Sequence, residues 1–457
     1  VESRAQMNML PRLRPKTFYD LVIEVAIVRP GPIQGDMVHP YLRRRHGEEK
    51  IEYPDARVEK VLSRTLGIPI FQEQVIQLVM VAAGFSAGEA DRLRRAMATF
   101  GKRGDLHQFR EPVIRGMMRN GYTHEWAERL FEMMKGFAGY GFPESHSASF
   151  ALLVYLSAWL KRHHTSAFYC GLLNSLPMGF YSPSQLIQDA RRHGVEVRPV
   201  DALHSHWDYT LEDAERFHQG KHPALRIGFR QVKGFNEDAA IRIVRARKKK
   251  PFRSLEDLCL RAALAGNERE QLVNADALRT LSGHRYQSHW QNLGIEEARP
   301  LFESDNREED LLPLPTPSEL DTLLADYRHL GLTLGKHPLA LVRHLPAFEK
   351  CLSARELRRG RHGQLARVAG LVTNRQRPGT ASGVLFMTLE DETGNSNVIV
   401  WKSLQETFRR EILAGRLLLI KGTLEKSPEG IVHLVAGHIS DHTNVLASLD
   451  VHSRDFH

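Results

Sequence analysis

A basic run that follows a short turn is the part of the sequence best suited to bind an anion. Arg242 to Arg253 contains seven lysines and arginines and no acid, and Lys233-Gly234 opens a predicted helix just before it. An apolar residue, Lys-Gly and a helix start are typical of a helix-hairpin-helix, whose backbone N–H groups and helix N-terminus hold one phosphate without reading base sequence. The predicted DNA-binding residues are Lys233, Gly234, Asn236, Arg242, Arg245, Arg247, Lys248, Lys249 and Lys250.

Asn236 stands where this hairpin usually has a second glycine. Asparagine is one of the few residues that tolerate a left-handed backbone, so Asn236 can still take that conformation. Residues 254–281 look like a second helical pair, which would make the motif a tandem. The simpler interpretation of the whole segment is a solvated helical turn with one charged face.

Five strand-like runs with a helix between the third and the fourth occupy the C-terminal part, and this order is that of an OB-fold. The runs are 365–373, 384–390, 397–401, 416–425 and 431–439, the helix is 402–412, and turns are expected at Gly394-Asn395 and 428–430. Aromatic faces on such a barrel stack on bases, at about 1–3 kcal/mol per base. Phe386 and Trp401 are possible stacking platforms, with Arg375, Arg377 and Lys421 nearby, but strand alternation favours Phe386 as a barrel-filling residue.

Two N-terminal segments have side chains that suit a phosphorylated small ligand. Leu93 to Gly104 is a helix end entering a glycine-punctuated loop, and its basic residues would form charge-assisted forks to phosphate oxygens. By itself, a basic helix end more often complements the helix dipole. Gly139 to Phe150 is a tight turn that feeds an apolar helix, with His146 and Ser147 as possible ligand contacts. Taken alone, this turn is best explained by Ser145 as a helix N-cap.

The elements that position these residues change type along the chain. Residues 66–83 and 127–137 show helical periodicity, and Ser86 and Thr123 mark helix starts. Residues 296–326 hold 10 acids, 2 bases and several prolines, which predicts a linker. The longest apolar stretch, 148–160, is 13 residues long. A membrane span needs about 20, so this stretch predicts a buried helix.

Net charge, cysteine spacing and acidic-residue spacing indicate what kind of partner this protein binds and in which compartment it works. With 63 Lys and Arg against 54 Asp and Glu, the net charge is +9, which favours a polyanionic partner such as nucleic acid. Cys170, Cys259 and Cys351 are far apart and indicate reduced thiols of a cytosolic protein. No two aspartates stand two residues apart, and no acidic pair precedes a plausible strand in residues 1–180. Two-metal phosphoryl transfer needs clustered carboxylates, so no metal site is predicted here.

The order of these segments resembles the C-family bacterial DNA polymerases, the alpha subunits of DNA polymerase III. The matching motifs are Glu2-Ser-Arg, Val28 to Ile33, His46-Gly47, Ile51 to Pro54, Gln72 to Val75, Leu93 to Met97, Gly139 to Phe142 and Ser145 to Ala148. Within the family the chain is most similar to the error-prone, damage-tolerant branch. That similarity rests on Arg4 to Met7, Ile23 to Ala26, Gly35 to Leu42, Leu173 to Tyr181 and Ser453 to His457.

The resemblance implies a multidomain, mainly α chain that ends in an all-β OB-fold. The expected divisions are helical fingers at 1–215, a tandem helix-hairpin-helix at 216–295, an acidic linker and helix at 296–350, the OB-fold at 351–443 and a tail at 444–457. The fingers would bind the incoming dNTP through Arg94, Arg95, Lys102, Arg103, Arg29, His146 and Ser147. The palm aspartates that bind Mg²⁺ in this family are expected upstream of Val1, so no catalytic residue is assigned.

The implied activity is that of an error-prone DNA-directed DNA polymerase, which adds dNMP to a primer 3′ end during translesion synthesis. This stretch alone would be inactive. Expected partners are primer-template DNA, the single-stranded template and, through a Y-family-like accessory protein, the sliding clamp. The expected location is the cytoplasm, at the nucleoid. The alternative is a non-enzymatic DNA-binding scaffold that uses the same hairpin and OB domains.

Overall fold

The structure is a computed structural model that describes most of the chain. The described ranges are 4–28, 38–103, 107–137, 142–178, 181–215, 222–295, 314–378, 383–428, 430–446 and 454–456. Contacts divide the chain into two compact units, Val1–Trp159 and Leu160–His457. Over the described ranges, no helix combines the length and the apolar character needed to cross a bilayer.

The first unit is helical. Its helices are α1 (Arg4–Leu13), α2 (Phe18–Ile27), α4 (Val38–Arg45), α5 (Ala56–Leu62), α6 (Gln72–Ala83), α7 (Ala87–Arg103), α8 (His107–Arg119), α9 (His124–Phe137) and the start of α10 (Glu144–His163). One apolar core that includes Phe71 and Phe131 joins them. Ser86 and Thr123 accept hydrogen bonds from backbone N–H groups of α7 and α9, which confirms both predicted helix starts.

The predicted helix at 66–83 is shorter than its periodicity indicates. Leu66 and Gly67 both have positive φ, 54° and 79°, so the chain leaves the right-handed helical region there. The helix α6 then begins at Gln72, where the Gln74 side chain accepts hydrogen bonds from the backbone N–H groups of Ile70 and Phe71. Those apolar residues belong to the core without being helical.

The prediction that 148–160 forms a buried helix is half wrong. The segment is helical, as part of α10, but Leu153 is 57% exposed and Tyr155 is 52% exposed. The core of the first unit includes Ala151 and extends no further along the helix. The side chains that follow Ala151 on α10 do not belong to this core, so their apolar character alone does not bury them.

The second unit begins with helices around a small sheet. These elements are α11 (Thr165–Asn174), α12 (Pro183–Arg192), β1 (Val197–Arg198), β2 (Thr210–Glu212), β3 (Ala224–Arg226), α13 (Glu237–Lys249), α14 (Leu255–Arg261), α15 (Gly266–Asn274), α16 (Arg279–Ser282) and α17 (Arg285–Leu293). The sheet order is β1-β3-β2. A shared core that includes Phe229, Leu258 and Leu272 holds α13 to α15 together. The predicted second helical pair is confirmed as α14 and α15.

Three helices lie between this region and the barrel: α18 (Glu319–His329), α19 (Pro338–Val342) and α20 (Ala354–Arg359). Most of the predicted acidic linker, 296–313, lies outside the described residues. Its C-terminal part forms α18, which starts where Ser318 and Asp321 make a reciprocal capping box. Leu323 and Tyr327 of α18 pack in an apolar cluster with Leu417 and Leu419 of the barrel.

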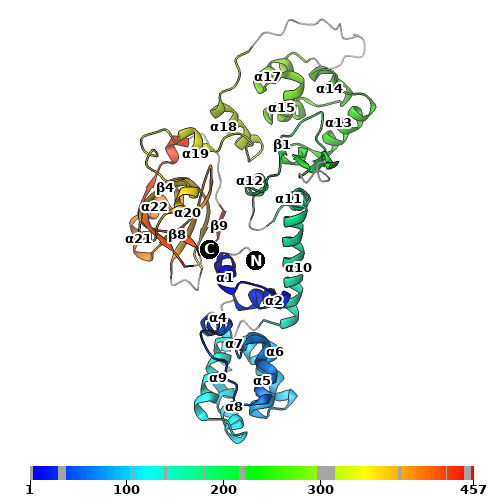
Figure 1. The fold of residues 1–457 in the computed structure, drawn as a ribbon. Helices are drawn as coiled ribbons and strands as arrows, with labels where there is room; N and C mark the ends of the chain where they lie inside the picture. Colours follow the sequence, from blue (N-terminus) through cyan, green and yellow to red (C-terminus); the bar gives the residue numbers. More distant parts are fainter. Residues whose placement is uncertain are drawn as a thin grey trace. The chain divides into compact units, whose positions relative to one another are not determined.

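The C-terminal region is a six-stranded sheet, five strands of which close into a barrel. Its strands are β4 (Leu365–Gln376), β5 (Leu385–Asp391), β6 (Gly394–Val400), β7 (Leu417–Lys426), β8 (Val432–Asp441) and β9 (Arg454–Phe456). The order is β5-β6-β8-β7-β4-β9, and the β4–β5 pairing closes the barrel (Figure 1). Helices α21 (Lys402–Thr407) and α22 (Arg409–Ala414) stand between β6 and β7, so the predicted OB-fold order is confirmed. The β5–β6 turn is at Glu392-Thr393, two residues before the predicted turn at Gly394-Asn395.

Candidate nucleic-acid interface

The hairpin segment, Val232 to Asn236, leads directly into α13. Gly234 has a φ of +78°, the left-handed conformation that glycine adopts most easily. Asn236 does not share it: its φ is −104°, and its side chain accepts a hydrogen bond from Ala239 N–H as the N-cap of α13. Asn236 therefore does not use the left-handed conformation that asparagine tolerates, because an N-cap residue has an extended backbone.

Lys233 is engaged with a helix end rather than left free. Its Nζ donates to the Tyr327 carbonyl at 3.2 Å, and its backbone N–H donates to the His329 carbonyl at 2.9 Å. Both carbonyls belong to the last turn of α18, where the helix dipole concentrates negative charge. In addition, exposed Glu237 and Asp238 lie in the first turn of α13 and disfavour an anion there. In this structure the hairpin segment holds α18.

The basic run that follows divides into two groups. Arg242 donates to the Ala262 carbonyl at 3.0 Å and pairs with Glu268 at 2.6 Å. Arg247 donates to the Ala202 and His204 carbonyls at 2.8 and 3.2 Å, and burial lowers its pKa. The other five basic residues of the run are exposed and free to meet a phosphate backbone; they are Arg245, Lys248, Lys249, Lys250 and Arg253.

Glu268, in the first turn of α15, is the acid that organises this region. It is 6% exposed, accepts from Asn236 Nδ2 at 2.9 Å and from Ala265 N–H at 3.0 Å, and pairs with Arg242. Burial raises its pKa, but these hydrogen bonds outweigh burial and hold the pKa below its usual value. A charged Glu268 thus ties α13 to α15.

On the barrel, Phe386 lies on the opposite face from the one expected. Leu385, Met387 and Leu389 fill the interior, so alternation along β5 places Phe386 outward. The register pairs Phe386 with Ile399 of β6. Trp401, two residues further along the chain, is 53% exposed. The interior assignment of Phe386 is wrong, and the outer face of β5 and β6 has an apolar, partly aromatic strip.

The basic candidates on the barrel have different surroundings. Arg375 is 6% exposed, and its guanidinium donates to the Ile412 and Gly415 carbonyls at 2.6 and 2.5 Å. It therefore connects β4 to the end of α22 inside the domain, away from any external ligand. Arg377 is exposed just after β4, and Lys421 is exposed on β7 directly opposite Arg367 of β4.

The nucleotide candidates of the first unit are distributed over several elements. Arg94 and Arg95 both pair with Asp91 on α7, at 2.9 and 2.7 Å. Lys102 and Arg103 belong to the end of α7, and their side chains lie outside the described part of the chain, as does the whole of Arg29. Arg94 and Arg95 share a helix surface with an acid between them, which lowers their net charge.

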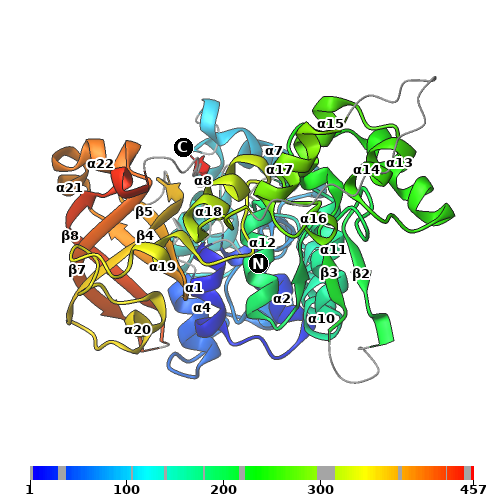
Figure 2. The same ribbon diagram turned by 90° about the horizontal axis from the view of Figure 1, so that it is seen from above.

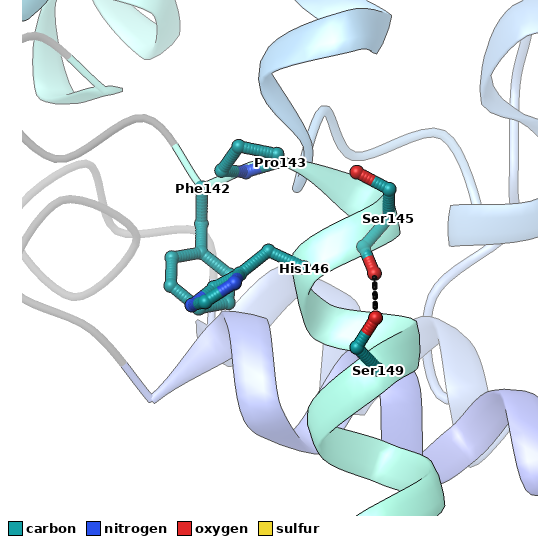
Figure 3. Close-up of a pocket in the computed structure, with 5 residues that line it drawn as sticks. All are labelled: Phe142, Pro143, Ser145, His146 and Ser149. Atoms are coloured by element: carbon teal, nitrogen blue, oxygen red, sulfur yellow. Dashed lines mark hydrogen bonds between the residues drawn. The ribbon is translucent and has the colours of Figure 1, made fainter.

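A pocket of about 590 Å³ opens at the N-terminus of α10 (Figure 3). It is lined by Phe142, Pro143, Ser145, His146 and Ser149. The His146 ring lies edge-on between Phe142 and Phe150, with ring centroids 4.9 and 4.7 Å apart. An exposed imidazole at a helix N-terminus is able to donate to an anion.

Two other residues of this turn differ from the sequence interpretation. Pro143, not Ser145, is the N-cap of α10, because its carbonyl accepts the first intrahelical hydrogen bond, from Ser147 N–H. Ser147 is fully buried, so it does not face the pocket, and its Oγ has no hydrogen-bond partner among the described residues.

One group of basic residues was missed by the sequence interpretation. Arg355, Arg358 and Arg359 on α20, with Arg361 just after it, are all exposed. The signal was the run Arg355-Glu-Leu-Arg-Arg-Gly-Arg361, which is shorter and less purely basic than the run on α13. The residues that the structure describes do not gather three or more His, Cys, Asp or Glu side chains into a metal site.

Three domain profiles match the chain in succession. The profile of the bacterial DNA polymerase III alpha subunit finger domain matches residues 1–121. A helix-hairpin-helix profile matches residues 194–288, and the profile of the OB-fold nucleic acid binding domain matches residues 366–441. The matches cover the candidate nucleotide, hairpin and barrel regions in that order.

Curated relatives extend this likeness over the full chain. The chain is 57% identical over 458 residues to an error-prone DNA polymerase of Alkalilimnicola ehrlichii, covering 100% of the chain and 44% of the relative. It is 55% identical over 464 residues to the error-prone DNA polymerase of Teredinibacter turnerae, covering 100% of the chain and 45% of that relative. The chain thus spans somewhat less than half the length of the relatives it matches.

Among solved structures, an asparaginyl-tRNA synthetase from Pyrococcus horikoshii matches 20% of this chain and 23% of its own, at 22% identity and a TM-score of 0.18. That likeness is too partial to carry an argument. The assignment rests instead on the order of the three profile matches and on the sequence identity over the whole chain. On these grounds the chain is similar over its whole length to part of the error-prone DNA polymerases, and its residues 1–121 match the finger domain of the bacterial DNA polymerase III alpha subunit.

Proposed function

We propose that the chain is the fingers, hairpin and OB portion of an error-prone DNA-directed DNA polymerase. In the complete protein, these domains hold primer and template while dNMP is added to the primer 3′ end opposite damaged bases. The observation that carries the proposal is 57% identity to an error-prone DNA polymerase across the whole chain. The order of the three matched domains supports it.

Each region has a distinct task in this proposal. Arg245 and Lys248 to Lys250, exposed at the end of α13, contact duplex phosphates without reading sequence. Phe386, Ile399 and Trp401 on the barrel stack on bases of the single-stranded template. Arg377 is exposed at the end of β4 and neutralises a neighbouring phosphate.

The first unit receives the incoming dNTP in this proposal. His146 lines the pocket at the N-terminus of α10, where helix N–H groups favour an anion. Arg94 and Arg95 on α7 supply positive charge, reduced by Asp91. Magnesium is the proposed metal of the complete enzyme, where it neutralises charge that develops on the phosphates. The described residues offer no cluster of ligands for it, so we derive no metal-dependent step.

The complete polymerase is proposed to act in the cytoplasm, at the nucleoid. Its proposed partners are primer-template DNA and, through a Y-family-like accessory protein, the sliding clamp. The net charge of +9 supports attraction to DNA but does not select among protein partners.

Fluorescence anisotropy on a primed template, together with primer extension in magnesium and all four dNTPs, tests the proposal. We expect binding that weakens with salt, and no extension by this chain. Extension would overturn the assignment, because catalytic carboxylates would then have to lie among these residues. Absence of binding to both duplex and single-stranded DNA would overturn it as well.

A further inference from the structure

Six exposed basic side chains form a surface on one side of the OB domain, which we call the α20 surface. Four of them come from α20 and the turn after it, and two come from neighbouring strands of the barrel. They are Arg355, Arg358, Arg359, Arg361, Arg367 of β4 and Lys421 of β7.

A strand pairing and two hydrogen bonds join these residues into one surface. Arg367 and Lys421 are direct cross-strand partners in the β4–β7 pairing. The Arg367 carbonyl accepts from Leu352 N–H at 2.8 Å, just before α20 begins. The Arg358 carbonyl accepts from Lys426 Nζ at 3.2 Å, which ties α20 to the end of β7. The two strands and the helix therefore present their charges side by side.

Glu356 interacts electrostatically with Arg359 of this surface without forming an ion pair with it. Within the part of the chain that the structure describes, none of the six side chains forms an ion pair with an acid. Glu356 is the single acid within 355–361, and its carboxylate accepts from Ser353 N–H at 2.8 Å and Ser353 Oγ at 2.7 Å. It is held at the N-terminus of α20 by that capping box.

Helix-dipole complementarity explains only part of the set. Arg358 and Arg359 are in the last turn of α20, where basic residues stabilise a helix. Arg355 is in the first turn, where a positive charge is unfavourable, and Arg367 and Lys421 are on strands. The helix dipole therefore does not account for those three charges.

We propose that the α20 surface binds the phosphate backbone of the single-stranded nucleic acid whose bases stack on β5 and β6. The location supports this: Arg358 Nη2 lies 3.5 Å from the Asn395 carbonyl, and Arg355 N–H donates to Thr393 Oγ1 at 3.1 Å. Both contacts are at the β5–β6 turn, so α20 borders the strands that present Phe386, Ile399 and Trp401. This inference rests on the proposed function and adds a second face to the OB domain.

The chemistry favours a flexible polyphosphate. Arginine forks bind phosphate oxygens in pairs, and five of the six cations are arginines. Charges spread over a helix, a turn and two strands suit a chain that bends around the barrel. The profile match of residues 366–441 is to a nucleic acid binding domain, which favours nucleic acid over an acidic peptide or an anionic membrane.

The matched pair of variants is Arg358→Glu with Arg359→Glu, against Arg409→Glu with Arg410→Glu. Both pairs are adjacent exposed arginines on short helices of the OB domain, and both change the formal charge equally. In Figure 2, α20 and α22 lie at different ends of the barrel. Affinity of the full chain for a short oligo-dT is measured from low to high salt, with thermal unfolding as a check on folding.

We expect the α20 pair to reduce the slope of log affinity against log salt by about 1.4, since each single-strand phosphate contact contributes about 0.7. At about 0.15 M salt this corresponds to at least a roughly tenfold loss of affinity. The α22 pair should leave the slope within error of the unmodified chain.

Trp401→Ala separates failure of this inference from failure of the proposed function. If Trp401→Ala weakens oligo-dT binding but the α20 pair leaves the slope unchanged, the inference is overturned and the proposed function stands. If the unmodified chain does not bind oligo-dT, the proposed role of the OB domain fails first. Retained DNA binding together with lost binding to vesicles of anionic phospholipid would assign the surface to a membrane and overturn the inference.

Discussion

Two basic regions of the second unit, the α13 run and the α20 surface, use their charges in different ways. On α13, Arg242 and Arg247 donate to protein carbonyls and to Glu268, and Lys233 before it donates to the end of α18. On the α20 surface, all six cations are exposed, and within the described residues none is paired with an acid. The longer and more purely basic run is therefore the one more engaged in holding the protein together.

The comparison shows that local charge density does not locate a phosphate-binding surface. A guanidinium donates in several directions, so it readily bonds carbonyls at helix ends when the fold brings them close. Two of the seven basic residues of the α13 run, Arg242 and Arg247, face such carbonyls because α13 packs into the core with α14 and α15. The α20 residues project from a short helix of which only Ala354 and Leu357 are buried.

Arg375→Ala should give the largest effect, because this buried guanidinium bonds two carbonyls inside the OB domain. Leaving those carbonyls unpaired should lower the free energy of unfolding by about 3 kcal/mol, measured by urea denaturation. Arg377→Ala, two residues away and exposed, is the matched control and should change stability by less than about 0.5 kcal/mol. Equal effects would remove the distinction between structural and surface cations on the barrel.

Glu268→Gln should come second, with a loss of about 2 kcal/mol at neutral pH, because a charged acceptor for Asn236 and Arg242 is removed. The folded-state pKa of Glu268 is lowered, so its stabilisation is present above the ordinary carboxyl range and is lost as the pH falls through the folded pKa. Denaturation curves of the two proteins should converge towards acid pH. A gap that persists unchanged in acid would show that the charge of Glu268 is not what links α13 to α15.

Arg247→Met should cost about 1.5 kcal/mol of stability through the lost bonds to Ala202 and His204, without changing the salt dependence of duplex binding. Lys248→Glu with Lys249→Glu should do the reverse, reducing the log–log salt slope by about 1.8 at unchanged stability. Anisotropy across a salt series and urea denaturation measure both. A reduced slope for Arg247→Met would place that guanidinium on DNA and weaken the comparison.

Gly234→Ala should give the smallest effect, about 1 kcal/mol, since alanine is strained at a φ of +78°. An added Cβ would lie 2.9 Å from Gln271 Nε2, a flexible side-chain end that is able to move. Calorimetry measures the change in Tm. Gly430→Ala, also at positive φ but with no atom within 4 Å of an added Cβ, isolates the backbone contribution. A larger loss at Gly430 would indicate that the hairpin segment is not specially constrained.

Periodicity and capping predicted most elements of the fold, because both depend on residues close in sequence. The strand order and the inserted helices of the OB-fold followed from alternation, and the Ser86 and Thr123 helix starts followed from side chains that accept N–H groups three residues ahead. The side predicted for Phe386 was wrong, because alternation shows which residues share a face of a strand but not which face points inward, and Leu385, Met387 and Leu389 occupy the interior.

By itself, the sequence determined the domain types and their order and indicated the resemblance to a polymerase family, because short-range patterns and motif order do not depend on long-range contacts. Only the tertiary structure decided which cations are free, since Lys233, Arg247 and Arg375 meet carbonyls far along the chain. It also decided that the apolar middle of α10 is exposed, because burial requires a partner surface and not merely apolar side chains. Whether a cationic side chain is available to a ligand depends on the groups around it, and long-range packing decides which groups those are.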